Sequence, residues 1–166
     1  MKRSSDQFEQ SAMPHAGSLL RFALRLTRNP AAAEDLVQET LLLAWRGFHQ
    51  LEAGTNARAW LFRILIHAHY GQNRKARVRP QTVELSAAAS MGSRDGEFLE
   101  VTQALERLAD DHRAVLLLAV VEGFTCREIG EILTIPMGTV MSRLSRARDA
   151  MRESLSGSRD GEKAVK

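Results

Sequence analysis

The chain has few of the features that mark secreted, membrane-spanning or disulfide-stabilised proteins. Its single cysteine, Cys126, cannot form a disulfide within the chain, which is typical of proteins from a reducing compartment. No apolar run approaches the ~20 residues that are needed to span a bilayer, so we expect no membrane insertion. The N-terminal residues MKRSSDQFEQ lack the apolar stretch of a secretory signal. We therefore expect a cytoplasmic protein.

Patterns that would indicate an enzyme are also missing. The serine and histidine residues are scattered and form no nucleophile, metal or phosphate-loop arrangement. His67 and His69 are two positions apart on an expected helix, so their side chains point to different sides and are unsuited to sharing a metal. We predict no catalytic site, no metal site and no cofactor.

The composition is that of a globular protein with an uneven charge. Hydrophobic residues make up 44% and charged residues 26% of 166 residues, which suits one ordinary domain or two small ones. Residues 1–80 hold 12 basic against 6 acidic residues, whereas residues 81–166 hold 11 against 14. Basic residues concentrate in 58–79, where there is no acid, and in 143–152. Two basic patches separated by an acidic middle suggest two contact points on one polyanion.

Apolar residues recur at helical spacing through the first half of the chain. We expect a helix over 19–26 that ends before Asn29-Pro30, a second over 31–48 and a third over 57–77, with a loop at 49–56. The residues expected on the apolar side of the second helix are Val37, Leu41, Ala44, Trp45 and Phe48.

The periodicity fades between the two halves. Residues 80–96 are rich in Ser, Ala and Gly and predict a flexible linker. Helical patterns resume at Phe98 and again at Val115, and the segment from Ser156 is too polar to pack, so we expect it to be frayed. We predict an all-α protein of two small helical domains, the second a helix-turn-helix. The expected boundaries are 8–79 for the first domain, 97–155 for the second and 156–166 for a flexible tail.

Residues 125–152 carry the pattern of a helix-turn-helix. Thr125 and Glu128 form a capping box at the start of a short helix, and Gly130 leaves room for a close helix crossing. Pro136 is well placed as the first residue of a second helix, where its missing N–H costs nothing. The expected apolar face of this second helix consists of Met137, Val140, Leu144, Ala147 and Met151.

The opposite face of the second helix is polar and basic. It carries Thr139, Ser142, Ser145 and Arg146, with Arg143, Arg148 and Arg152 along its flanks. Such a helix is suited to the major groove of DNA, although a helix with a merely solvated basic face would have the same pattern.

An acidic face is expected on the helix at 31–48. Asp35, Gln38, Glu39, Leu42 and Arg46 share its outer side. Acids near a helix start complement the helix dipole without any further function, but this does not explain exposed leucines beside them. The face fits a protein partner that offers basic side chains and some apolar surface.

Three separated motifs resemble one protein family. AEDLVQETLLLAW at 33–45, GTNARAWLFRIL at 54–65 and GTVMSRLSRAR at 138–148 occur in the order found in extracytoplasmic-function sigma factors of the sigma-70 family. The resemblance covers roughly residues 15 to 153. It implies a non-enzymatic subunit that binds the bacterial RNA polymerase core, recognises promoter DNA, helps to open it and is held by an anti-sigma factor.

The resemblance also implies roles for single residues. On the outer face at 31–48 it places the polymerase contacts Asp35, Gln38, Glu39 and Leu42, which would dock on the clamp helices of the largest subunit. The loop at 52–57 would capture a flipped base of the minus-ten element, with Asn56 as a contact. The remaining minus-ten contacts would be Arg58, Arg63, His67, Arg74, Lys75 and Arg77. The minus-thirty-five contacts would be Thr139, Ser142, Arg143, Arg146 and Arg148, the last of them nearer to phosphates.

The sequence departs from the family pattern at several positions. Met141 replaces a usual lysine, Thr134 a usual turn glycine, and Leu43 a commonly basic residue. His67 and Gly71 differ from the family and leave the minus-ten specificity unassigned. Trp60 has the helical spacing of a core residue rather than of a stacking platform.

Two other functions fit parts of the pattern. One is a helix-turn-helix regulator whose N-terminal bundle senses a ligand or forms a dimer, and the acidic face at 35–39 argues against it. The other is a sigma-like decoy that sequesters an anti-sigma factor without reading DNA, and the arginines of 143–152 argue against that.

Overall fold

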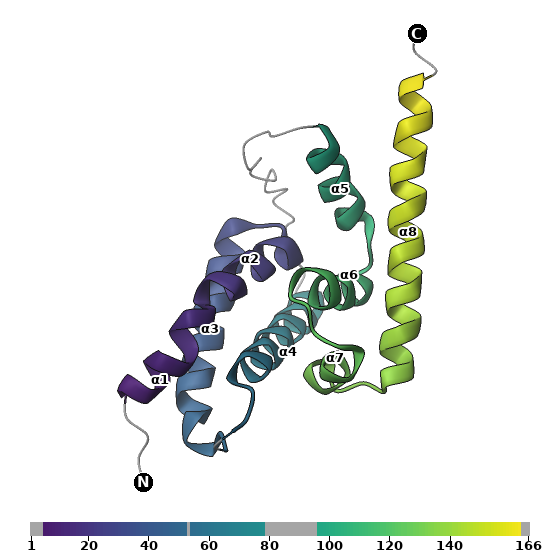
Figure 1. The fold of residues 1–166 in the computed structure, drawn as a ribbon. Coiled ribbons are helices and arrows are strands. Elements are labelled where there is room, and N and C mark those ends of the chain that lie inside the picture. Colours follow the sequence, from purple (N-terminus) through teal and green to yellow (C-terminus); the bar gives the residue numbers. More distant parts are fainter. Residues whose placement is uncertain (1–4, 53, 79–95, 164–166) are drawn as a thin grey trace. The chain divides into compact units, whose positions relative to one another are not determined.

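The computed structural model of the protein describes residues 5–52, 54–78 and 96–163, and every regular element in these ranges is a helix (Figure 1). The described residues up to 78 form one compact unit, and most of those from 96 onward form another. The predicted all-α class is confirmed. None of the helices in these ranges is long and apolar enough to cross a membrane. The linker expected at 80–96 lies outside the described residues, apart from Gly96.

The described residues of the first unit up to 78 form four α-helices. They are α1 (Ser5–Ala12), α2 (Ala16–Thr27), α3 (Pro30–Gly47) and α4 (Ala57–Val78), with short 3₁₀ helices at Met13–His15 and Phe48–Gln50. The last three agree with the helices expected from the sequence. Helix α1 was not predicted, and it buries Phe8 and Ala12 against the unit.

A tight turn joins α2 to α3. Arg28 adopts a left-handed conformation, with φ of 59°, and its N–H donates to the Leu24 carbonyl at 2.9 Å. Asn29 then caps α3, because its Oδ1 accepts a hydrogen bond from the Ala32 N–H at 3.0 Å. Pro30 is the first residue of α3, where the absence of an N–H has no cost. The turn therefore reverses the chain and starts α3 at a fixed residue.

Aromatic and aliphatic side chains from α2, α3 and α4 form the core of this unit. Phe22 of α2 and Phe62 of α4 meet edge to face, with ring centroids 5.2 Å apart. Leu36 of α3 is also fully buried. On the other side of α3, Asp35, Gln38 and Leu42 remain exposed.

The remaining helices belong to the second unit, except that the last three residues of α7 are grouped with the first. They are α5 (Gly96–Arg107), α6 (Asp110–Leu116), a π-helical segment at Leu117–Val121, α7 (Cys126–Leu133) and α8 (Met137–Lys163). Helix α8 extends past Ser156, where the sequence predicted a frayed tail, and the backbone keeps its helical form to Lys163.

A buried arginine fixes the turn between α5 and α6. Arg113 is 2% exposed, and its guanidinium donates to the carbonyls of Leu105 at 2.9 Å, Leu108 at 2.6 Å and Glu106 at 3.2 Å. Carbonyls at the end of a helix lack intrahelical partners and carry the negative end of its dipole. The charge is further balanced by Asp110 at 3.1 Å. These contacts set the position of the first turn of α6.

Replacing Arg113 by methionine tests this arrangement. We expect Arg113→Met to lower the free energy of unfolding by about 3 kcal/mol, because the buried carbonyls and Asp110 lose their donor. Urea titration followed by circular dichroism measures the loss. Arg107→Met, at an exposed position of α5, is the control and should change stability by less than about 0.5 kcal/mol. Equal midpoints for the two variants would contradict the role given to Arg113.

Candidate protein-binding and nucleic-acid interfaces

The outer face of α3 carries most of the residues expected there. Asp35, Gln38 and Leu42 are exposed, and Leu42 has 48% of its surface accessible. Glu39 is different, because it is half-buried and accepts a close hydrogen bond from Gln72 Nε2 of α4. Glu39 therefore joins α3 to α4 and is only partly available to a partner.

Trp45 lies on this outer face, which corrects the expectation that it belongs to the buried side of α3. Its side chain is 45% exposed, and its ring meets that of Phe8 of α1 in a T-shaped arrangement at a centroid distance of 5.3 Å. Seven residues separate Trp45 from Gln38, which places both on nearly the same side of a helix. The buried side carries Leu36 and Val37 together with smaller residues such as Ala33 and Thr40. The exposed face thus combines an acid, an amide and two large apolar side chains.

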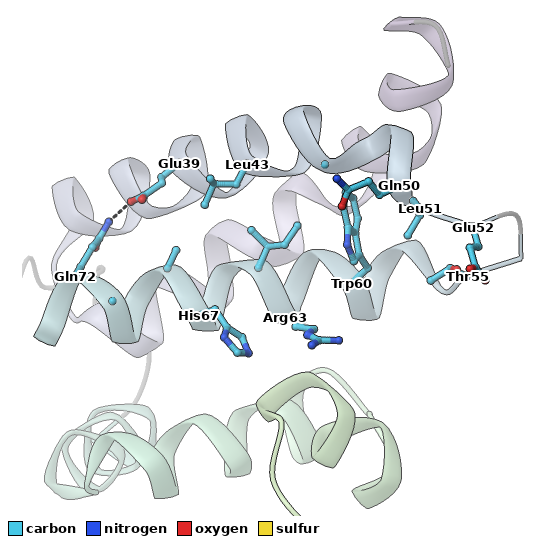
Figure 2. A pocket seen from close by; sticks show the side chains of 14 residues that line it. Glu39, Leu43, Gln50, Leu51, Glu52, Thr55, Trp60, Arg63, His67 and Gln72 are labelled. Atoms are coloured by element: carbon cyan, nitrogen blue, oxygen red, sulfur yellow. Dashed lines mark hydrogen bonds between the residues drawn. The ribbon is translucent and has the colours of Figure 1, made fainter. Parts of the chain in front are cut away.

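An open groove of about 800 Å³ lies between α3, the loop that follows it and α4 (Figure 2). Its lining includes Leu43 from α3, Glu52 and Thr55 from the loop, and Arg63 and His67 from α4. The sequence indicated the loop and the two α4 residues, but it gave no sign that Leu43 faces the same space. Apolar, acidic and basic groups therefore meet in one concave surface.

Trp60 packs at one end of this groove. It is half-buried, and a Cβ built on Gly47 of α3 would lie 3.6 Å from its ring. The ring thus rests on the α3 backbone where that helix ends, while another part of it lines the groove. It is neither a fully buried core residue nor a free stacking platform.

Asn56 has a structural role at the start of α4. Its Oδ1 accepts a hydrogen bond from the Ala59 N–H at 3.1 Å, and its carbonyl accepts one from the Trp60 N–H at 3.0 Å. The side chain expected to contact a flipped base is therefore also a helix cap. Thr55, its neighbour in the loop, lines the groove.

Three expected basic residues share one face of α4. Arg63, His67 and Arg74 are exposed, and their spacing of four and seven residues places them on the same side. His69 is buried and shares a hydrogen bond of 3.1 Å with Asn73, so the two histidines point to different sides as expected. Across the described ranges, no three His, Cys, Asp or Glu side chains are grouped so as to hold a metal ion.

Arg58 lies on a different face of α4. It is half-buried, with its guanidinium carbon 5.4 Å from the centre of the Phe62 ring, and roughly 140° around the helix from Arg63. Burial lowers the pKa of His15, and the nearby charge of Arg58 lowers it further. For Lys75 and Arg77 only the backbone of α4 is described, and their side chains lie outside the described residues.

The helix-turn-helix begins with the predicted capping box. Thr125 N–H donates to Glu128 Oε2 at 2.8 Å, and Glu128 N–H donates to Thr125 Oγ1 at 3.3 Å. Pro136 precedes α8 and accepts the Val140 N–H at 3.2 Å, so it is the capping residue rather than the first helical residue.

The turn between α7 and α8 is tight. Thr134 has a left-handed φ of 57°, a conformation usually taken by glycine, and Ile135 N–H donates to the Gly130 carbonyl at 3.0 Å. A Cβ on Gly130 would lie 3.0 Å from the Ile135 carbonyl oxygen, so the glycine is needed mainly for this backbone approach. Thr134 therefore adopts the left-handed conformation that suits the glycine usual at this position of the family. The cost is steric, because the Thr134 Cβ is crowded in this conformation.

Helix α8 buries Val140, Leu144 and Ala147 and exposes its polar side. Ser142 and Arg146 are exposed on that side, and Thr139 is half-buried at its edge. The remaining two expected contacts differ from these. Arg148 is exposed but lies roughly 160° around the helix from Arg146, and Arg143 forms an ion pair of 3.0 Å with Asp111 of α6.

Comparison with known proteins connects both units to one family. Residues 12–78 match the family described as Sigma-70 region 2, and residues 98–151 match the one described as Sigma-70, region 4. The chain is 34% identical over 152 residues to the ECF RNA polymerase sigma factor EcfG of Rhodopseudomonas palustris (strain TIE-1), covering 89% of this chain and 84% of that protein. It is 37% identical over 149 residues to the ECF RNA polymerase sigma factor SigL of Mycobacterium tuberculosis (strain CDC 1551 / Oshkosh), covering 85% and 84%.

Among solved structures, the fold is similar to that of the sigma factor RpoE from Bartonella quintana, which was crystallised with the anti-sigma factor NepR. The TM-score is 0.75 and the sequence identity 34%, over 91% of this chain and 98% of that one.

Proposed function

Because the chain belongs to the extracytoplasmic-function sigma factors of the sigma-70 family, we propose that its two units divide promoter recognition between them. The protein is an RNA polymerase sigma factor that directs promoter-specific transcription initiation. In the proposal, residues 8–79 bind core polymerase and the minus-ten element, and residues 97–155 bind the minus-thirty-five element. It acts in the cytoplasm, without catalytic chemistry of its own. The observation that carries this division is that each unit exposes basic side chains on one long helix, Arg63 and Arg74 on α4 and Arg146 and Arg148 on α8.

The outer face of α3 is the proposed contact with core polymerase. Leu42 and Trp45 are large apolar residues with nearly half of their surface exposed, beside Asp35 and Gln38. An aromatic anchor surrounded by polar groups is the usual centre of a protein interface. Glu39 contributes there to a lesser extent, because its carboxylate already accepts a hydrogen bond from Gln72.

The double variant Asp35→Ala with Gln38→Ala tests this contact. We expect its affinity for core polymerase to fall at least about tenfold, since two polar contacts are removed from the interface. Competition against the wild-type protein for core polymerase measures the change, with thermal unfolding as a check that the fold is kept. Glu153→Ala removes an exposed acid from α8 and should bind as the wild type does. Unchanged binding by the folded double variant would reject the assignment.

The groove between α3 and α4 is the proposed site for the opened minus-ten strand. An extruded base requires hydrogen bonds to its edge, which polar loop residues such as Thr55 provide. The part of the Trp60 ring that lines the groove adds aromatic surface beside them. Arg63, His67 and Arg74 form an exposed face that suits the phosphates of the same strand. Asn56, Arg58, Lys75 and Arg77 stay predicted contacts.

Substitution of Arg63 tests the strand path. We expect Arg63→Gln to weaken holoenzyme binding to a single-stranded minus-ten oligonucleotide and to reduce the slope of log K against log salt by about 0.7, as for one lost phosphate contact. Fluorescence anisotropy over a range of salt concentrations gives both values. Arg25→Gln removes the same charge from an exposed position on α2 and should leave the slope unchanged. Identical slopes for the two variants would exclude the proposed path.

The polar side of α8 is the proposed reader of the minus-thirty-five element. Ser142 and Arg146 are exposed opposite the buried row, and Thr139 borders them. An arginine that meets a guanine edge contributes to discrimination, whereas one that meets a phosphate contributes affinity alone. The position of Arg148 on another side of the helix suits a phosphate contact.

The variants Arg146→Ala and Arg148→Ala separate these two contributions. We expect Arg146→Ala to reduce the affinity ratio between the preferred upstream element and a substituted one roughly tenfold. Arg148→Ala should weaken binding to both elements equally. Equilibrium binding of holoenzyme to the two promoters measures the ratio, and a wild-type ratio in Arg146→Ala would overturn its assignment to base reading.

Control by an anti-sigma factor is the remaining part of the proposal. The similar RpoE structure contains the anti-sigma factor NepR, and this chain covers almost the whole length of that sigma factor. Exposed Leu42 and Leu43 offer apolar surface for such a partner on the first unit. A sigma-like decoy would bind the same partner but would not support transcription from a selected promoter in vitro. The other alternative is a helix-turn-helix regulator whose N-terminal bundle senses a ligand or forms a dimer. The match of residues 12–78 to Sigma-70 region 2 argues against it.

A further inference from the structure

One ion pair of the second unit joins α8, the proposed DNA-reading helix, to α6. Arg143 Nη2 of α8 lies 3.0 Å from Asp111 Oδ2 of α6, with the side chains 26% and 49% exposed. A second pair, Arg152 with Asp149, is also 3.0 Å long, but both of its residues belong to α8 and are more exposed, at 75% and 60%. The first pair therefore restrains its arginine from outside α8, whereas the second moves with the helix.

Arg143 stands at the edge of the side proposed to read bases. At about 100° per residue it is roughly 40° around the axis from Thr139 and 60° from Arg146. It also belongs to the first two turns of α8, and the N-terminal turns of a recognition helix are the ones that reach base edges. From this edge, we expect the direction of its side chain to decide whether the guanidinium meets a base or a phosphate.

Asp111 is itself held in place. It lies in the first turn of α6, where the helix dipole favours a negative charge. The position of this first turn is fixed by the hydrogen bonds that Arg113 donates to the carbonyls of Leu105 and Leu108 at the end of α5. The backbone that carries the Asp111 carboxylate is thereby fixed, and the carboxylate meets the Arg143 guanidinium at 3.0 Å.

The pair has two effects on a bound DNA. A guanidinium has five N–H donors, so one that is held by a carboxylate still has donors free for a base edge, and it loses less freedom on binding. The negative charge of Asp111 also repels phosphates and weakens the attraction of Arg143 to the DNA backbone. The first effect raises discrimination between sequences, and the second lowers affinity for every sequence. Because both groups are partly exposed, the pair contributes little to folding.

We propose that Asp111 is a positioning residue for promoter reading, which holds Arg143 toward the base edges of the upstream element and away from the phosphates. This inference rests on the proposed assignment of α8 to the minus-thirty-five element.

The test uses full-length protein in holoenzyme with core polymerase. The probes are a promoter whose upstream element the wild-type holoenzyme has selected from a randomised pool, and the set of its single base-pair substitutions. The quantity compared is the affinity for the selected promoter divided by the affinity for each substituted promoter. We expect Asp111→Ala to reduce this ratio roughly three- to tenfold at one base pair, the same pair at which Arg143→Ala loses discrimination. Affinity for the substituted promoters should rise. In the Arg143→Ala background, Asp111→Ala should change the ratio no further.

Asp149→Ala is the matched control. It removes an acid that pairs with an arginine of the same unit, so it should raise the affinity for all promoters without changing any ratio. Thermal unfolding of each variant should stay near that of the wild type.

Two results would overturn the inference. The first is a wild-type ratio at every base pair in Asp111→Ala. The second is an equal reduction of the ratio at all base pairs together with a lower unfolding temperature of Asp111→Ala, which indicates a purely structural role. If the wild-type holoenzyme shows no preference at the upstream element, the assignment of α8 and this inference both fail. A retained wild-type preference with an unchanged Asp111→Ala rejects this inference alone.

Discussion

The burial of one side of each long helix is the constraint on which the candidate interfaces depend. In α3 the small side chains of Ala33, Thr40 and Ala44 are fully buried, and this leaves the side with Asp35 and Trp45 exposed. In α8 the buried row of Val140, Leu144 and Ala147 directs Ser142 and Arg146 outward in the same way. Since a helix turns by about 100° per residue, packing one row of side chains fixes the direction of all others. The interfaces are thus a consequence of core packing.

Polar side chains at the ends of helices hold these packed helices in register. Asn29, Asn56 and the pair of Thr125 with Glu128 each satisfy backbone N–H groups that open a helix, and Arg113 satisfies carbonyls that close one. Short helices joined by tight turns depend on such caps. For this reason a polar residue in a loop is not by itself evidence of ligand binding, as the capping role of Asn56 illustrates.

The charged residues that the sequence predicts to be functional are of two kinds, those bonded to a side chain of another helix and those exposed to solvent. Glu39 is engaged by Gln72 and Arg143 by Asp111, and both partners come from another helix. Arg63 and Arg146 are exposed on faces suited to DNA. A charged side chain that a partner restrains binds in a fixed direction and loses little freedom on binding. A mobile, exposed charge attracts the DNA with a strength that depends on the salt concentration. Promoter recognition needs both, because affinity for the backbone alone does not select a sequence.

The sequence by itself determined the all-helical class, the positions of α2, α3 and α4, the capping box at Thr125 and, through three ordered motifs, the family. These features follow from local periodicity and end signals, which adjacent residues encode. Only the tertiary structure decided that Phe8 of α1 contacts the ring of an exposed Trp45, and that Arg143 is paired with Asp111. Periodicity reports the faces of one helix, but it does not say which side chain of another helix arrives there. That choice is made by the packing of segments that are far apart in the chain.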